Sequence, residues 1–313
     1  MARKLLIDTD PGIDDAMAIF YALNSPEFEV IGLTSIFGNA YTEICTQNAL
    51  RLLEIADRTE IPVAAGADRP LTVEFKGPAD FVHGANGQGN ANLPAPKIQP
   101  INQSAAEFIV DQIKQHPGEV TLAPLGPLTN IALALLLDPT IVDDIHEIVL
   151  MGGNAFVPGN ASPAAEANIL NDPEAADIVF GMQCPITMVG LDVTEKVYMS
   201  PEVLDHITSF DNPESQHLAK ILPFYHDFFT GRRGEPGIHV HDSTVISYLL
   251  DPALFTTVKH PIRVATSGIS RGKTWPAVGL ADVESPWSGR RDINICVDVN
   301  AAKVIEMELD RLK

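Results

Sequence analysis

Short apolar runs alternate with amphipathic stretches along this 313-residue chain. Such runs are typical of buried strands, and amphipathic stretches of helices. We expect strands at residues 4–8, 28–37, 120–123, 146–151, 186–191, 258–266 and 292–299, and helices at 14–24, 42–56, 128–137, 244–250, from Pro173 and from about 301. This alternation predicts an α/β fold, with a largely parallel, Rossmann-like sheet and helices on both faces. We expect residues 1–313 to form a single domain.

One part of the chain interrupts this pattern. The segment 68–104 contains five prolines and several glycines, and it shows no sustained apolar periodicity. Glycine and proline clusters are typical of loops. We therefore expect a long loop here that lies beside the active site.

Composition narrows the class of ligand. Hydrophobic residues make up 45% of the chain and charged residues 20%, which is typical of a soluble globular protein. The formal charge is −20, from 41 acidic and 21 basic residues. This charge repels nucleic acids and anionic bilayers. We therefore expect a small substrate that is not strongly anionic.

The cysteines and the N-terminus bear on location. Cys45, Cys184 and Cys296 are odd in number, and no pair has metal-ligand spacing. Reduced thiols in a cytoplasmic protein are the simplest explanation. The apolar run before Asp8 is too short for a signal peptide, and no run reaches the length of a membrane span. We therefore expect a cytoplasmic protein.

Four aspartates, Asp8, Asp10, Asp14 and Asp15, surround the Pro11-Gly12 turn between a predicted strand and a predicted helix. Carboxylates this close repel one another unless a cation offsets their charge. A helix cap explains one of them but not four. Because no cysteine or histidine is nearby, the ligand set is made of oxygen atoms and suits Ca²⁺ or Mg²⁺ rather than Zn²⁺.

Two later segments carry further polar side chains. His241 and Asp242 precede the helix at 244–250, where Asp242 is also suited to be a helix cap. Asn160, Glu166 and Asn168 offer the donors and acceptors that sugar hydroxyls need, although ordinary loop polarity explains them equally well. Ligands of open α/β sheets bind beyond the carboxyl ends of the strands. Four segments follow predicted strands, so we expect them to converge on one rim: 8–15, 38–39, 124–126 and 151–153.

Short motifs follow one another in order over nearly the whole chain. They are Asp8-Thr9-Asp10-Pro11-Gly12-Ile13-Asp14-Asp15-Ala16, Gly38-Asn39, His83-Gly84, Gly126-Pro127-Leu128-Thr129-Asn130-Ile131-Ala132, Val149-Leu150-Met151-Gly152-Gly153, Glu166-Ala167-Asn168, Asp172-Pro173-Glu174-Ala175-Ala176 and Val240-His241-Asp242. In this order they resemble the nucleoside hydrolase family, and the inosine-uridine-preferring enzymes in particular. The first motif is highly specific.

The resemblance implies a Ca²⁺-dependent enzyme that hydrolyses the N-glycosidic bond of ribonucleosides and releases ribose and a free purine or pyrimidine. It also implies a homo-oligomer, either a dimer or a tetramer. The implied calcium ligands are Asp10, Asp15, Asp242 and the backbone carbonyl of Leu125. Asp10 is implied as the base that accepts a proton from the attacking water, and Asp8 as support for the ligands.

The resemblance also implies substrate contacts. The ribose 2′- and 3′-hydroxyls are assigned to Asp14, Asn168 and Asp242, the 5′-hydroxyl to Asn160 and Glu166, and packing against the sugar to Met151. Asn39 is expected beside the reaction centre, His241 as proton donor or orienting group for the leaving base, and His83 near that base. Ala167 departs from the aromatic residue that the family often has there, so base preference stays open.

Three alternatives remain. The aromatic residues Phe224, Tyr225, Phe228 and Phe229 line the base pocket or, as their helical spacing favours for at least half of them, belong to the core. A haloacid dehalogenase-type phosphohydrolase also begins with an Asp-x-Asp pair, but it requires a later lysine that we do not find here. A non-catalytic, calcium-dependent riboside-binding protein is the third, and Asp10 beside the metal argues against it.

Overall fold

The computed structural model describes residues 2–234, 236–279 and 285–313. Its main sheet has the strand order β3-β2-β1-β4-β5-β6-β12-β9, and neighbouring strands are parallel except for the antiparallel pair β12 and β9 at one edge. These strands are β1 (Arg3–Thr9), β2 (Phe28–Ser35), β3 (Val63–Ala65), β4 (Val120–Pro124), β5 (Ile145–Met151), β6 (Ile186–Val189), β9 (Phe255–His260) and β12 (Ile293–Val299). The predicted α/β fold with a mostly parallel sheet is confirmed.

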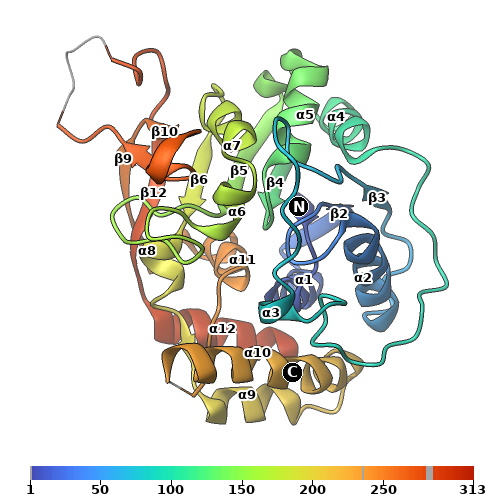
Figure 1. The fold of residues 1–313 in the computed structure, drawn as a ribbon. Helices are drawn as coiled ribbons and strands as arrows, with labels where there is room; N and C mark the ends of the chain where they lie inside the picture. Colours follow the sequence, from blue (N-terminus) through green and yellow to red (C-terminus); the bar gives the residue numbers. More distant parts are fainter. Residues whose placement is uncertain (1, 235, 280–284) are drawn as a thin grey trace.

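Helices cover both faces of this sheet (Figure 1). They are α1 (Ile13–Leu23), α2 (Thr42–Ile55), α3 (Asp80–His83), α4 (Ala105–Gln115), α5 (Thr129–Leu137), α6 (Ala167–Asn171), α7 (Pro173–Phe180), α8 (Leu191–Thr194), α9 (Pro201–Thr208), α10 (Pro213–Arg233), α11 (Ser243–Leu250) and α12 (Ala301–Leu312). Among the described helices, none is long and apolar enough to cross a membrane.

Strand β1 explains why the sheet needs cover on both sides. Side chains alternate between the two faces of a strand. Leu5 and Ile7 pack into one hydrophobic cluster with α1, α10, α11 and α12, whereas Leu6 packs into a second cluster with α4, α5 and α7. All three side chains are fully buried. A strand buried on both faces has a continuous apolar sequence, and this is the pattern from which it was predicted.

Three details differ from the predicted elements. The strand signals near 258–266 belong to two strands: β9 ends at His260, and β10 (Ile262–Val264) pairs with β11 (Thr274–Pro276) in a separate small sheet. Pro261 lies between β9 and β10, and proline cannot donate to a strand ladder. The strand predicted to reach residue 37 ends at Ser35. Helix α4 was not predicted, although Ser104 and Glu107 form a capping box at its start.

The long segment 68–104 largely agrees with the expected loop. It contains only the short helix α3, and its residues 77–79 and 81–83 line a cavity beside the ends of β1, β4 and β5. A further pair of short strands, β7 (Tyr198–Met199) and β8 (Ile238–His239), forms a small separate sheet just before α11. The loops after β1, β2, β4 and β5 and the start of α11 lie at one rim of the main sheet, where they line the same cavity.

Candidate active site

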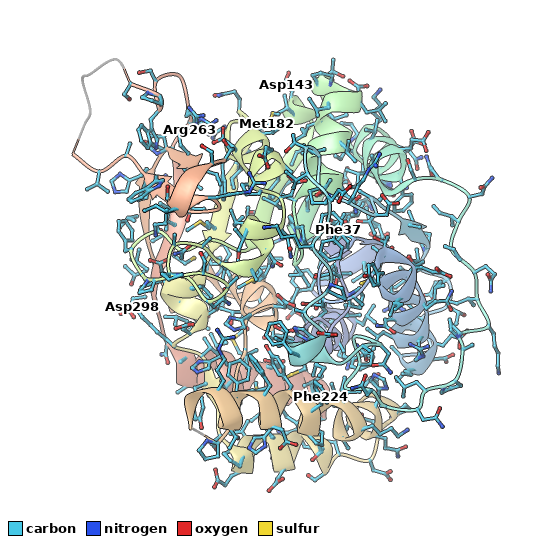
Figure 2. All side chains as sticks on the ribbon, viewed as in Figure 1. Phe37, Asp143, Met182, Phe224, Arg263 and Asp298 are labelled. Carbon is cyan, nitrogen blue, oxygen red and sulfur yellow. The ribbon has the colours of Figure 1, made fainter. Side chains whose placement is uncertain are left out.

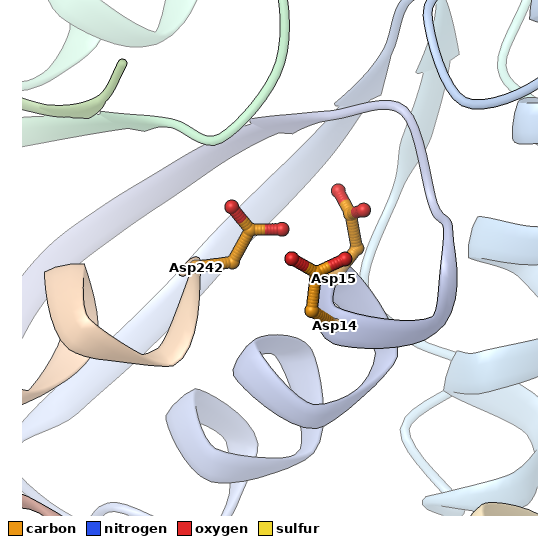
Figure 3. Close-up of side chains that lie close together, drawn as sticks. All are labelled: Asp14, Asp15 and Asp242. Carbon is orange, nitrogen blue, oxygen red and sulfur yellow. The ribbon is translucent and has the colours of Figure 1, made fainter. Parts of the chain in front are cut away.

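Three carboxylates gather at the rim where α1 and α11 begin. Asp14 and Asp15 belong to the first turn of α1, and Asp242 directly precedes α11. One oxygen of each lies within 4.8 Å of one oxygen of the other two, and all three residues are buried (Figure 3). Asp242 does not cap α11 through its side chain, so the capping alternative raised from the sequence is wrong. Its carboxyl is directed to the cluster.

Asp10 lies next to this cluster, at the end of β1, in a space that only glycines leave open. A Cβ atom on Gly38 would lie 2.0 Å from its Oδ2, and one on Gly126 would lie 2.5 Å from its Oδ1. The backbone N–H of Asn39 donates to Oδ2 at 2.7 Å. Asp10 is outside the three-residue group defined above, so its role as a metal ligand stays a prediction.

The charges of these residues are strongly coupled. Burial, followed by the charge of Asp15, raises the pKa of Asp10 well above its ordinary range. Burial and the charge of Asp14 do the same to the pKa of Asp242. Burial raises the pKa of Asp14 to about 7, and Asp15 adds to the effect. Without a counter-charge, these groups cannot all be ionised at neutral pH.

Several buried oxygens also lack a hydrogen-bond donor. Within the described part of the chain, Oδ2 of Asp8 and Oδ1 of Asp10 and Asp14 have no partner. Buried polar atoms are normally satisfied, so unpaired carboxylate oxygens beside a crowded anionic cluster require an explanation. An oxygen-liganded divalent cation supplies both the missing partner and the missing positive charge. The residues therefore fit a metal ion.

Asp15 is oriented by its neighbours. Its carboxylate accepts from the hydroxyl of Thr9, from the backbone N–H of Gly12 at 2.9 Å and from the side-chain amide of Asn39 at 2.9 Å. Asn39 therefore holds Asp10 through its backbone and Asp15 through its side chain. Asn39 also lines the cavity described below, and its place beside the reaction centre stays a prediction.

Asp8 lies behind the cluster. Its Oδ1 accepts from Thr34 at 2.6 Å and from Asn130 at 2.7 Å, and the residue is fully buried. Burial raises its pKa to about 7. The supporting place expected for Asp8 agrees with this position.

A cavity of about 370 Å³ opens in front of the carboxylates. Its volume lies in the range of small-molecule sites. The sequence-predicted residues in its lining are Asp14, Asn39, His83, Leu125, Met151, Asn160, Glu166, Asn168, His241 and Asp242. Of the predicted site residues, Asp10 and Asp15 are outside this lining. The expected convergence on one rim is confirmed.

Glu166 and Asn168 have unequal freedom to bind a ligand. Glu166 caps α6: its carboxylate accepts from the backbone N–H groups of Asn168, Ile169 and Gly153 at 2.8–3.1 Å. Asn168 donates its side-chain amide to the carbonyls of Leu125 at 2.6 Å and Met151 at 3.2 Å. The contact of Glu166 with a 5′-hydroxyl stays a prediction.

The two expected histidines are held differently. His241 is buried, and its Nδ1 lies 2.9 Å from the hydroxyl of Thr194. The Nδ1 of His83 accepts from the backbone N–H of Ile13 at 3.2 Å, so this nitrogen carries no proton. Burial lowers the pKa of His83 to about 3. The 3.9 Å approach of Asp14 to the same nitrogen is therefore not an ion pair.

Tyr225 is a site residue whose contact the sequence did not indicate. Its hydroxyl donates to Oδ2 of Asp14 at 3.2 Å, and its ring stacks on His83 with centroids 5.3 Å apart. With Phe228 and Phe229 it lines the cavity. Phe224, labelled on α10 in Figure 2, packs against the core instead. The core expectation holds for Tyr225 and Phe229, which belong to the core cluster, and a place for the aromatic residues in a base pocket stays a prediction.

Comparison with known proteins explains this arrangement. The sequence model of the family described as "Inosine-uridine preferring nucleoside hydrolase" matches residues 5–306. The chain belongs to this family. Neither alternative activity agrees with this membership, and the predicted hydrolysis of ribonucleosides to ribose and a free base by an N-glycosyl hydrolase is confirmed.

Individual relatives of this nucleoside hydrolase span its full length. "Probable uridine nucleosidase 2" of Arabidopsis thaliana is 49% identical, over 99% of this chain and 97% of its own. "Inosine-uridine preferring nucleoside hydrolase" of Crithidia fasciculata is 35% identical, over 100% and 98%. The solved structure "Plant nucleoside hydrolase - PpNRh1 enzyme" superposes with a TM-score of 0.97 at 39% identity, over 100% and 99%.

Proposed function

We propose that this nucleoside hydrolase is calcium-dependent and that uridine is a preferred substrate. The observation that carries the metal is the buried cluster of Asp14, Asp15 and Asp242, together with the unpaired oxygens of Asp10 and Asp14. Calcium takes six to eight oxygen ligands in flexible geometry. Bound here, it would lower the pKa of a water and hold ribose hydroxyls in place.

The proposed ligands are Asp10, Asp15, Asp242 and the carbonyl oxygen of Leu125. Asp10 and Asp15 have fixed orientations, because Asn39 donates to both. The carbonyl of Leu125 accepts one hydrogen bond from Asn168 and keeps a second lone pair. This set combines three carboxylates with one neutral oxygen, which suits a hard cation.

Asp10 is the proposed general base. Its Oδ1 has no hydrogen-bond partner among the described residues, while its Oδ2 is held by Asn39. A carboxylate oxygen has two lone pairs, so Oδ1 can contact the proposed cation and still accept a proton from an attacking water.

The ribose is proposed to lie between the cluster and the far wall of the cavity. Its 2′- and 3′-hydroxyls would meet Asp14, Asn168 and Asp242, and its 5′-hydroxyl Asn160 and Glu166, with Met151 against the ring. All six residues line the cavity. Positive charge develops on the sugar as the glycosidic bond breaks, and the acidic wall favours that charge.

The leaving base is proposed to receive a proton from His241, with His83 nearby. Both residues line the cavity, and the hydroxyl of Thr194 orients the ring of His241. His83 is neutral and its Nδ1 is occupied, so His241 is the better candidate for proton transfer. General acid catalysis of this kind contributes about 10²–10⁴-fold.

The preference for uridine is supported by relatives. Several similar proteins carry uridine or pyrimidine in their names, including "Uridine nucleosidase 1" of Arabidopsis thaliana at 42% identity and "Pyrimidine-specific ribonucleoside hydrolase RihA" of Escherichia coli at 40%.

One experiment tests both the preferred substrate and the metal. It is a panel of uridine, cytidine, inosine, adenosine and guanosine, with free ribose as the readout, before and after calcium removal by a chelator. Equal rates on all five nucleosides contradict the preference, and full activity in chelator contradicts the metal.

The chain is also proposed to be a cytoplasmic homo-oligomer, a dimer or a tetramer. Buried, unpaired Cys45, Cys184 and Cys296 support a reducing compartment. The oligomer follows from the family resemblance, and light scattering of the purified protein tests it. A monomer at micromolar concentration contradicts it.

A further inference from the structure

The peptide group between Gly12 and Ile13 is held from both sides by one short segment of the 68–104 loop. The side-chain amide of Gln88 donates to the carbonyl of Gly12 at 2.7 Å. The backbone N–H of Ile13 donates to His83 at 3.2 Å. This peptide group leads into the first turn of α1, which carries Asp14 and Asp15. Its position therefore helps to fix the positions of both carboxylates.

A second buried amide holds the preceding carbonyl. Asn48, on α2, donates to the carbonyl of Pro11 at 3.0 Å, and Arg51 donates to the side-chain oxygen of Asn48 at 2.6 Å. Gln88 also approaches the carbonyl of Pro11 at 3.3 Å. Both carbonyls of the Pro11–Gly12 turn are thus fixed by side chains from other parts of the fold.

Helix α10 fixes the orientation of Gln88. The Nε2 atom of His217 lies 2.8 Å from Oε1 of Gln88. The amide hydrogens of Gln88 face backbone carbonyls, so its Oε1 accepts and His217 Nε2 donates. Gln88 is 1% exposed and His217 is 3% exposed, and neither lines the cavity. Their contact with a substrate is therefore excluded by position.

We propose that Gln88 is a positioning residue for the cation site, acting through the Pro11–Gly12 turn, and that His217 orients its amide. The turn is coupled to the ligands directly, because the backbone N–H of Gly12 donates to Oδ2 of Asp15. A loosened turn leaves the carboxylates free to separate, which weakens cation binding. This inference rests on the proposed calcium site.

The experiment measures calcium affinity directly, by titration calorimetry on metal-stripped protein well below its melting temperature. Gln88→Met keeps the length of the side chain and removes its hydrogen bonds. The matched control is Gln99→Met, at an exposed position in the same loop. The hydrogen bond from Gln88 to the Gly12 carbonyl is worth about fivefold in an equilibrium constant, so Gln88→Met is expected to bind calcium about fivefold more weakly than wild type and Gln99→Met equally well.

A pair of substitutions at His217 separates orientation from packing. His217→Phe keeps a ring against Phe20, which the imidazole meets edge-on at 6.0 Å, but it cannot donate to Gln88. His217→Gln loses the ring and keeps a donor. We expect His217→Gln to bind calcium more tightly than His217→Phe. A merely structural role gives the reverse order, because Phe preserves more of the buried contact.

The outcomes distinguish the two proposals. If the wild-type protein binds no calcium, the proposed calcium site and this inference are both contradicted. Wild type that binds calcium while Gln88→Met binds it equally well overturns the role of Gln88 alone. If Gln88→Met does not fold, the relative calcium affinities of His217→Gln and His217→Phe decide whether the inference stands. The melting temperature of each metal-free variant is recorded, and a change in stability without a change in calcium affinity also overturns the inference.

Discussion

The side chain of Asn168 donates to the backbone carbonyl of Leu125 at 2.6 Å. It also donates to the carbonyl of Met151, so both of its amide hydrogens are used by the protein. Its Oδ1 is the polar atom left for a ligand, and the residue lines the cavity. Asn168 is therefore prepared to accept a hydrogen bond from a sugar hydroxyl while it steadies a proposed metal ligand.

This arrangement predicts discrimination between sugars. Sites built to bond a hydroxyl can reject the analogue lacking it by roughly 10⁴–10⁵, so kcat/KM for 2′-deoxyuridine is expected to be far below that for uridine. Asn168→Ala should narrow the gap by slowing uridine, since the hydroxyl contact is then absent with both substrates. Equal losses on both sugars mean that Asn168 only shapes its loop. Comparable wild-type rates contradict the ribose contacts altogether.

Asp10→Asn tests the proposed base. The substitution keeps an oxygen that can accept from Asn39 and removes the negative charge. Turnover of uridine should fall by about 10²–10⁴-fold, while binding of a non-hydrolysable riboside largely survives. Single-turnover rates and calorimetric binding measure the two effects separately. A variant with near-wild-type turnover places the base elsewhere.

His241→Ala tests the proposed acid. Uridine leaves poorly without a proton, whereas the p-nitrophenyl group of a p-nitrophenyl riboside needs none. We expect His241→Ala to slow uridine at least about 100-fold more than the nitrophenyl substrate. Thr194→Val, which removes the hydroxyl 2.9 Å from the imidazole, should act in the same direction but more weakly. Equal losses on both substrates show that His241 is structural.

The stability of the calcium-free protein should fall as the pH rises. The pKa values of Asp8, Asp14 and Glu308 are raised by burial to about 7 in the folded state. Unfolded carboxyls titrate near pH 4, so between about pH 4 and pH 7 the folded state binds more protons, and its stability decreases with pH. We expect the melting temperature in chelator to drop by about 5 °C or more from pH 5 to pH 8.

Two controls accompany this measurement. Added calcium should restore the melting temperature at pH 8, because the ion stabilises ionised carboxylates and binds only the folded state. Glu308→Gln should reduce the pH dependence while the response to calcium remains, because Glu308 is buried against Ser243 rather than in the cluster. A melting temperature that rises from pH 5 to pH 8 without calcium contradicts these pKa shifts.

The sequence predicted the positions of those site residues that come directly after a strand. Asp14 and Met151 were expected at one rim because each lies in a segment that follows a predicted strand, and both line the same cavity. Tyr225 was expected in the base pocket or the core but not in contact with Asp14, and Gln88 was not assigned a role. Their hydrogen bonds to Asp14 and Gly12 join residues 211 and 76 positions apart, and no local periodicity carries that information.

The sequence also left two possible roles open for some of the residues that it placed in the site. Glu166 was assigned to a sugar hydroxyl, and its carboxylate also caps α6, a second role that the same sequence context permits. Asp242 was open to a capping role and instead faces the cluster. A carboxylate before a helix can accept from backbone N–H groups or turn away from them, and only the surrounding fold decides.

The position of β12 bears on the order in which the site is completed during synthesis. This strand is near the end of the chain, yet it lies in the sheet between β6 and β9. Strands β1 to β6 are made first and pair with one another without it. A growing chain on the ribosome therefore presents Asp14 and Asp15 long before Asp242 is made, and domains generally fold as units. The carboxylate cluster can therefore be complete only after synthesis has passed Asp242.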